Sequence, residues 1–190
     1  MIKIEKQYDG VTLVDIQLAS AYYPLLVDLA KHKHCLTYGE LVTKAKEEYP
    51  NRPEVQNAIA VSTGRRLDVV RMFTSEHDLP DLTSLIISKG SGECGVGFTR
   101  NFDPKTSRDK VFAFDWSIVT TDFDGFLEIT KKSIKPRIPV KETKALELMS
   151  SYYQENKKDL PKSIRESREQ ILELIMEGLS PEEAFSQARH

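Results

Sequence analysis

Hydrophobic residues recur at helical spacing along most of this chain. In residues 22–31 the apolar side chains stand at i, i+3, i+4 and i+7, which predicts a helix with one buried stripe. Thr37 and Glu40 form a Thr-x-x-Glu capping box that opens a second helix over residues 37–48. A further apolar stripe predicts a third helix over residues 65–75.

Other stretches show the spacing of β-strands. Residues 2–17 alternate between apolar and polar side chains and predict a short strand or hairpin. Residues 82–88 contain a continuous apolar run and predict a strand. The glycine-rich segment 89–92 then predicts a turn, and residues 96–98 follow as the returning strand of a hairpin.

The C-terminal part has helical spacing with clear boundaries. Two apolar stripes within residues 145–175 predict two helices. Ser180-Pro181, with Glu183 at the N3 position, opens a third helix. Residues 121–141 hold two prolines and a run of basic side chains, which predicts a linker. We therefore expect three regions, over residues 1–120, 121–141 and 142–190.

The order of the central elements predicts the fold. Helix, loop, helix, strand, glycine-rich turn and strand follow one another as in a winged-helix module. We predict an α+β, mainly helical protein with a winged-helix-like central module, preceded by an N-terminal strand and helix and followed by a C-terminal helical extension. In the helix-turn-helix part of such a module, the second helix enters the major groove of DNA.

Short motifs in this module resemble a known family. LTYGEL at residues 36–41 is similar to the start of the DNA-binding domain of O6-alkylguanine-DNA alkyltransferases and alkyltransferase-like proteins. GRR at residues 64–66 falls near that family's helical arginine, and residues 79–98 are similar to its active-site strand and wing. The resemblance covers about a third of the chain and implies a fold and DNA contact.

The resemblance does not extend to the family's chemistry. Residues 83–87, Thr-Ser-Leu-Ile-Ile, stand where the family has Pro-Cys-His-Arg. Cys94 lies in the predicted turn and does not replace the missing cysteine. The spacing between Tyr38 and Arg65 is also longer than the family's, by an insertion around residues 49–53. Alkyl transfer is therefore not implied.

Five side chains are candidate DNA contacts. The resemblance places Tyr38 beside a phosphate and Arg65 or Arg66 in a groove, while Lys89 and Arg100 flank the predicted wing. Each has a structural alternative. A tyrosine on a first helical turn can be a packed aromatic, and the arginines and the lysine can be solvated side chains.

Catalytic and metal-binding patterns are weak. Residues 32–35, His-Lys-His-Cys, offer three ligands too close together to surround one zinc ion, and no second cluster completes the set. Asp122, Asp124 and Glu128 could bind a divalent cation, as in a nuclease, but no lysine motif of recognisable spacing accompanies them. We predict no catalytic residue, no metal site and no cofactor.

Composition and charge narrow the class of protein. The 39% hydrophobic and 29% charged residues are ordinary for a globular chain, and the net charge of −2 argues against a nonspecific nucleic-acid binder. Residues 31–72 carry eight basic and five acidic side chains, whereas residues 142–190 carry seven and ten, so a local phosphate-binding face is allowed. The chain has only two cysteines, and its N-terminus does not read as a signal peptide. No apolar run approaches the roughly 20 residues of a membrane span, so we expect a cytoplasmic protein.

Three functions remain after these arguments. The first is a DNA-binding or DNA-sensing protein without catalysis, whose C-terminal helices bind a protein partner or a second copy. The second is a protein-interaction adaptor that reuses the winged-helix fold, which the near-neutral charge favours. The third is a small DNA-processing nuclease. A DNA titration at two salt concentrations separates the first two, because phosphate contacts impose a salt dependence that adaptors lack.

Overall fold

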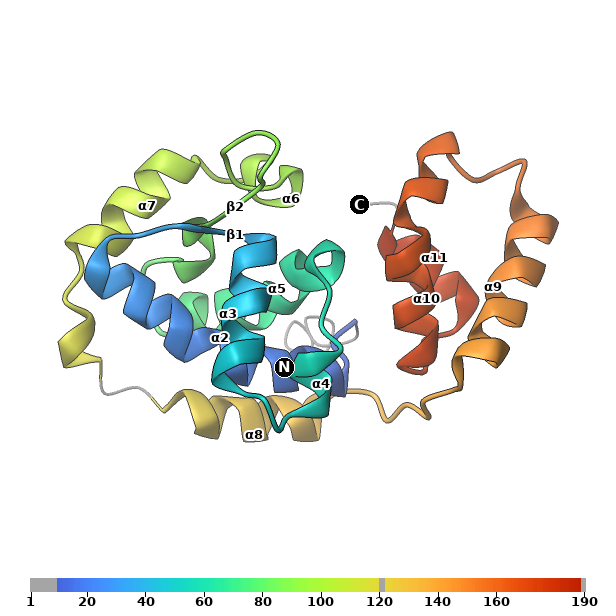
Figure 1. The fold of residues 1–190 in the computed structure, drawn as a ribbon, viewed down its shortest axis with the longest axis horizontal. Coiled ribbons are helices and arrows are strands. Elements are labelled where there is room, and N and C mark those ends of the chain that lie inside the picture. Colours follow the sequence, from blue (N-terminus) through green and yellow to red (C-terminus); the bar gives the residue numbers. More distant parts are fainter. Residues whose placement is uncertain (1–9, 120–121, 189–190) are drawn as a thin grey trace. The chain divides into compact units, whose positions relative to one another are not determined.

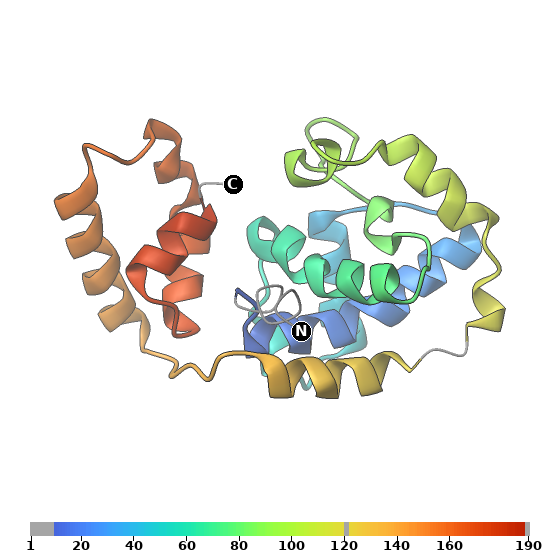
Figure 2. The same cartoon turned by 180° about the vertical axis from the view of Figure 1, so that it is seen from behind.

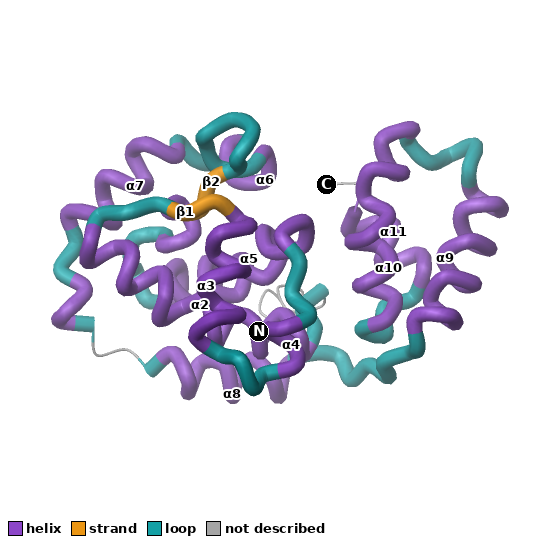
Figure 3. The backbone as a smooth tube through the Cα atoms, in the orientation of Figure 1, coloured by secondary structure: helices purple, strands orange, loops and turns teal. Residues whose placement is uncertain are grey.

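The computed structural model describes residues 10–119 and 122–188 of the chain. The chain forms two compact units, each of which has most of its residue contacts within itself. The first is Leu13–Ser133, and the second is Ile134–His190 together with Met1–Thr12. Helices dominate both units (Figure 1). The described residues contain one sheet, of two short strands, drawn orange in Figure 3. The prediction of a mainly helical α+β protein is confirmed.

The first unit is arranged around its longest helix, α2 (Leu13–His32). This helix packs against α3, α4, α5 and α8, and Figure 2 shows α5 and α8 from behind. The other helices of this unit are α3 (Tyr38–Glu48), α4 (Pro53–Gln56), α5 (Ala60–Glu76), α6 (Val96–Thr99), α7 (Pro104–Ala113) and α8 (Phe123–Ser133).

Helix α2 starts earlier than the sequence predicts. Residues 13–17 are helical, so the predicted strand or hairpin over residues 2–17 is wrong for that part, and residues 1–9 lie outside the described residues. Buried positions such as Ile16, Ala19 and Leu26 continue with helical spacing from the first turn to the last. Asp15 is also buried, and it pairs there with Arg65 and Arg66 of α5.

By length and composition alone, α2 could cross a membrane. In the structure, 56% of its most apolar window is buried inside the protein. Its apolar face packs against the neighbouring helices of the first unit, as in the core helix of a soluble protein.

The predicted hairpin is wrong. The strands β1 (Leu36–Thr37) and β2 (Ile86–Ile87) pair in parallel, and they lie far apart in the sequence. The segment before β2, Leu82–Leu85, is a 3-10 helix whose N-cap Asp81 accepts a hydrogen bond from the Thr83 amide. The expected returning strand, residues 96–98, is part of α6. A nonlocal parallel pair leaves no periodic signal in the sequence.

The turn predicted after β2 is confirmed. Gly92 has φ +67°, a left-handed conformation that glycine adopts without strain, and its N–H donates to the Ser88 carbonyl at 2.8 Å. The Ser88 N–H in turn donates to the Glu93 carbonyl at 2.8 Å. These two bonds close the loop between β2 and α6.

An aromatic cluster joins α8 to the core of the first unit. The ring of Phe123 stacks on Tyr23 of α2 at 4.0 Å between centroids and meets Phe73 of α5 edge-on at 4.8 Å. Phe126 also contacts Phe73, which is fully buried. Within the predicted linker, residues 121–141, the segment Phe123–Ser133 is therefore a helix with a buried apolar face. Residues 135–140 have no regular secondary structure, in line with their two prolines.

The second unit is a small helical cluster. It contains α9 (Glu142–Asn156), the 3-10 segment η3 (Lys162–Ser167), α10 (Arg168–Met176) and α11 (Pro181–Ala188). The capping box predicted at the start of α11 is present, since the Glu183 N–H donates to Ser180 Oγ at 3.2 Å and the Ser180 N–H donates to the Glu183 carboxylate at 3.0 Å. Gly178, predicted to close α10, has φ +94°.

Candidate nucleic-acid interface

Local sequence fixes the start of α3. Thr37 is the N-cap, and its side chain accepts a hydrogen bond from the Glu40 N–H at 3.3 Å. The Glu40 carboxylate accepts from the Thr37 N–H at 2.7 Å. These bonds from Thr37 lower the pKa of the Glu40 carboxyl group, with a smaller contribution from the charge of Lys89. The capping box therefore places Tyr38 on the first turn of α3, as predicted.

Tyr38 connects α3 to two other segments. Its hydroxyl oxygen accepts a hydrogen bond from the Gly95 N–H at 3.4 Å, and a Cβ added at Gly95 would lie 3.0 Å from that oxygen. A Cβ at Gly64 of α5 would lie 3.7 Å from the Tyr38 ring. Burial is the main cause of a raised Tyr38 pKa. The half-buried ring is thus a packed aromatic. Its hydroxyl oxygen accepts the hydrogen bond from Gly95, so the hydroxyl hydrogen does not take part in that bond.

Arg66 is buried in the core, which corrects its prediction as a DNA contact. Helix α5 begins at Ala60, so Arg65 and Arg66 lie in its second turn rather than at its start. The Arg66 side chain has 0% exposure, and its Nη1 donates to Asp15 Oδ1 at 2.5 Å. A guanidinium enclosed in this way cannot reach a phosphate, and moving it out would leave a buried carboxylate without this partner.

Arg65 shares the same carboxylate. Its Nη2 donates to Asp15 Oδ2 at 2.7 Å, and its side chain retains 15% exposure. Asp15 therefore receives one guanidinium on each oxygen. The pair links α5 to α2 over a long sequence separation, and no local motif indicates it. The arginine pair that suggested a DNA-reading helix is mainly a connection between two helices.

Lys89 and Arg100 are the most accessible of the predicted contacts. Both are exposed, and neither forms an ion pair with a carboxylate among the residues that the structure describes. Lys89 follows β2, and Arg100 follows α6 directly. Exposed cations without a protein partner are available to a phosphate.

Lys89 also lines a surface hollow of about 590 Å³ beside the start of α3. The lining mixes two lysines with two glutamates, and one of these, Glu40, is held in the capping box. The hollow is therefore close to neutral and forms no concentrated anion site. Its lining residues are Leu36, Thr37, Gly39, Glu40, Thr43, Lys44, Glu47 and Lys89.

Arg71 of α5 contacts both the segment before β2 and the aromatic rings in and after α6. Its Nε donates to Asp81 Oδ2 at 3.0 Å, and its Nη2 donates to Thr83 Oγ1 at 3.0 Å. The guanidinium carbon lies 5.1 Å from the ring centroid of Phe98 and 5.7 Å from that of Phe102. Arg71 thus connects α5 to the 3-10 helix Leu82–Leu85 (η1) and to α6. Its only sequence signal is Asp68 three residues earlier, a common surface pair.

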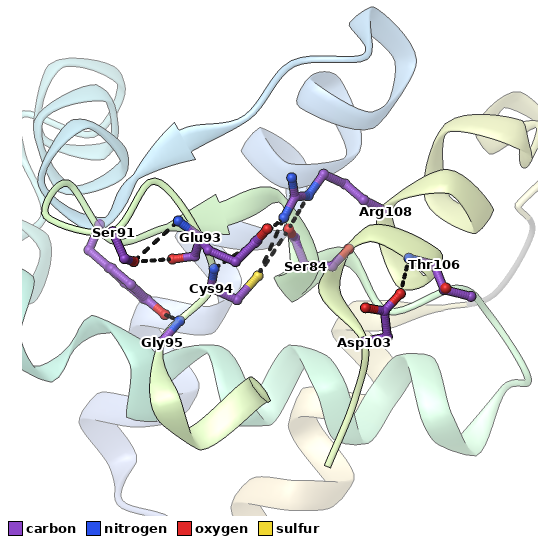
Figure 4. A network of polar contacts seen from close by, with 9 residues as sticks. Ser84, Ser91, Glu93, Cys94, Gly95, Asp103, Thr106 and Arg108 are labelled. Atoms are coloured by element: carbon purple, nitrogen blue, oxygen red, sulfur yellow. Dashed lines mark hydrogen bonds and ion pairs between the residues drawn. The ribbon is translucent and has the colours of Figure 1, made fainter. Parts of the chain in front are cut away.

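Arg108 of α7 anchors the loop that leads from β2 to α6 (Figure 4). Its Nε donates to the Ser84 carbonyl at 3.1 Å, and its Nη2 donates to the Glu93 carboxylate. The Cys94 thiol donates to the same Ser84 carbonyl at 3.4 Å, and Arg108 Nη2 lies 3.9 Å from its sulfur. This network fixes the loop that bears Gly95, and hence the segment against Tyr38.

Neither cysteine is prepared for nucleophilic attack. Burial raises the pKa of the Cys94 thiol, against the opposing effect of Arg108. Burial also raises the pKa of Cys35, despite the same arginine. A nucleophilic cysteine must be a thiolate, whereas these groups are held as neutral thiols. Ser84, in the stretch that replaces the family's cysteine motif, is fully buried in its turn.

The carboxylates weighed for a nuclease do not converge. Asp122 accepts a hydrogen bond from the Gly125 N–H at 2.8 Å, as an N-cap residue of α8 does. Within residues 10–119 and 122–188, no three His, Cys, Asp or Glu side chains gather in a way that could hold a metal ion, and this covers Asp122, Asp124 and Glu128 as well as residues 32–35.

Comparison with known proteins gives no further guide to this surface. No known protein family, curated protein or solved structure matches the chain.

Proposed function

We propose that the unit Leu13–Ser133 is a non-catalytic DNA-binding or DNA-sensing module of winged-helix-like type. In this proposal α3, α4 and α5 act as the helix-turn-helix, and the loop between β2 and α6 acts as a reduced wing. The observation that carries the proposal is the position of Tyr38 between Gly64 and Gly95. It brings the start of α3, the first half of α5 and the loop to one surface.

The N-terminus of α5 supports this proposal. Its N-cap, Ile59, makes no side-chain capping bond, and the hydroxyls of Ser62 and Thr63 both bond back to the Ile59 carbonyl. The first amide groups of this 17-residue helix thus receive no cap from the side chain of their N-cap residue, and the helix dipole is positive at this end. A DNA phosphate is a suitable acceptor for such groups.

The proposed contacts differ in part from those predicted from the sequence. Lys89 and Arg100 contact phosphates, and the Tyr38 hydroxyl donates its hydrogen to another phosphate oxygen. Arg65 retains 15% exposure and is oriented by Asp15. The protein has few phosphate contacts and a net charge of −2, so its nonspecific affinity for duplex DNA is low. Its binding is therefore selective for a particular DNA structure.

A salt-dependent titration tests the proposal. The full chain is titrated with fluorescent duplex and single-stranded DNA at two salt concentrations. Replacing Lys89 and Arg100 by Ala should weaken binding and lower the slope of log K against log salt by about 2, one for each lost phosphate contact. The matched control is Lys157→Ala with Lys158→Ala, two exposed lysines of the acidic second unit, which should change nothing. No salt-dependent binding of the wild-type chain to any DNA would refute the proposal.

The protein-interaction adaptor remains a second candidate. It is favoured by the near-neutral charge and by an apolar groove in the second unit. Both activities are compatible with a cytoplasmic protein that joins a DNA structure to a second component. The two functions lie on different units of the chain and can therefore be tested separately.

A further inference from the structure

The second unit carries an apolar groove that its own helices leave open. Four side chains of α9, at positions i, i+3, i+4 and i+7, form one wall: Leu146, Met149, Ser150 and Tyr153. The remaining lining comes from η3, α10 and α11, and the volume is about 550 Å³. Ile171 and Phe185, both 2% exposed, form the floor. The groove is therefore a gap at the edge of a packed core, with room for bulky apolar side chains.

Two arginines, Arg165 and Arg168, give this groove a positive rim. Arg165 Nε donates to the Tyr153 hydroxyl at 2.9 Å, and its guanidinium carbon lies 5.8 Å from the centroid of the same ring. This contact holds Arg165 at the rim without neutralising it. Neither arginine forms an ion pair with a carboxylate among the described residues.

The charge of the groove is opposite to that of its surroundings. Residues 142–190 carry ten acidic and seven basic side chains, yet the groove is lined by two arginines and no acid. An apolar surface with an unneutralised positive rim complements a ligand that is apolar and negatively charged. Guanidinium groups suit this role because they bind carboxylates in a bidentate manner.

We propose that this groove binds an acidic amphipathic peptide segment of a partner protein. Leu or Phe side chains of the segment enter the groove between α9 and α10, and neighbouring Asp or Glu side chains pair with Arg165 and Arg168. The one-sided stripe of α9 and the open groove fit helix-in-groove recognition, in which apolar anchors repeat at i, i+3 or i+4. This interaction goes beyond the proposed DNA contact and does not depend on it.

Fluorescence anisotropy with the full chain tests the proposal. The probe is a fluorescein-labelled helical peptide, on the order of ten residues long, built from Leu, Phe, Asp and Glu with the apolar residues on one face. Two matched probes carry Lys in place of the acids, or Ser in place of the apolar residues. We expect the acidic apolar probe to bind at least about tenfold more tightly than either.

Variants then locate the binding site. Arg165→Glu with Arg168→Glu should reduce affinity about tenfold or more, while the control Lys157→Glu with Lys158→Glu should not. Ser150→Trp should block the groove from an exposed position, with circular dichroism unchanged. Equal binding of the acidic and Lys probes, or full binding by both groove variants, would overturn the proposal. So would a homodimer in analytical ultracentrifugation that the Arg165 and Arg168 reversals dissociate, because a second copy would then occupy the groove.

Discussion

Arg66 Nη1 and Asp15 Oδ1 lie 2.5 Å apart in the core of the first unit, with side-chain exposures of 0% and 2%. Arg65 binds the other oxygen of the same carboxylate. These contacts form because α2 and α5 pack side by side. The arrangement makes the position of α5, and hence of the proposed DNA surface, depend on one aspartate near the start of α2.

Removing one partner of this pair should be costly. Asp15→Asn removes the carboxylate charge that Arg65 and Arg66 share, and we expect a loss of about 3–5 kcal/mol in the free energy of unfolding. Urea denaturation followed by circular dichroism measures it. Asp28→Asn is the control, because Asp28 is 52% exposed and its Lys44 contact is 3.9 Å long. We expect about 1 kcal/mol or less there. Similar costs for the two variants would show that the Asp15 pair is not buried as described.

Tyr38→Phe separates packing from DNA contact. The variant keeps the ring between Gly64 and the loop but loses the hydroxyl that accepts from Gly95. Stability should fall by only about 0.5–1.5 kcal/mol, because one hydrogen bond is lost. If the hydroxyl also donates to a phosphate, duplex affinity should fall further than stability explains. Unchanged affinity at both salt concentrations would assign Tyr38 to packing alone.

Glu183 should make the second unit sensitive to acid. The side-chain hydrogen bond from Arg137, followed by the Ser180 amide and nearby charges, lowers the Glu183 pKa to about 2. Its usual value is 4.5. A lowered folded-state pKa means that the stabilisation is complete above about 4.5 and is lost as the pH falls toward 2.

Thermal unfolding from pH 7 to pH 2 measures this effect. Glu183→Gln should unfold at a lower temperature than the wild type at pH 7, and the difference should shrink between about pH 4.5 and 2. Glu147→Gln is the control, because Glu147 is 69% exposed and pairs with Lys144 on its own helix. A difference between wild type and Glu183→Gln that stays constant down to pH 2 would contradict the role of Glu183.

Cys35 and Cys94 should remain unmodified by alkylated-guanine DNA. Burial raises the pKa of both thiols, so little thiolate exists near neutral pH. Mass spectrometry of the intact chain after incubation should show no added alkyl group. A general thiol reagent should label half-buried Cys35 before buried Cys94. Stoichiometric alkyl transfer to Cys94 would show that the loop opens and that Cys94 is a reactive nucleophile.

The sequence by itself determined those features whose interacting residues lie within one helical turn or one loop. The capping boxes of Thr37 with Glu40 and of Ser180 with Glu183 act within one helical turn, so the starts of α3 and α11 are encoded locally. The prolines at residues 136 and 139 likewise predicted an irregular segment, and Gly92 predicted the turn after β2.

Only the tertiary structure decided the elements whose partners are distant in sequence. The apolar run within residues 82–88 predicted a hairpin strand. Instead, residues 82–85 form a 3-10 helix capped by Asp81, and residues 86–87 pair in parallel with β1. Residues 123–133 form a helix on the core because Phe123 packs against Tyr23 of α2 and Phe126 packs against Phe73 of α5.

The candidate site divides in the same way. Lys89 and Arg100 are exposed, as expected for charged residues next to a glycine-rich loop. Arg66 is buried because Asp15, far away in the sequence, supplies the charge that makes burial of a guanidinium tolerable. Sequence shows that a side chain is charged, whereas only the fold determines whether that charge faces solvent or a buried partner.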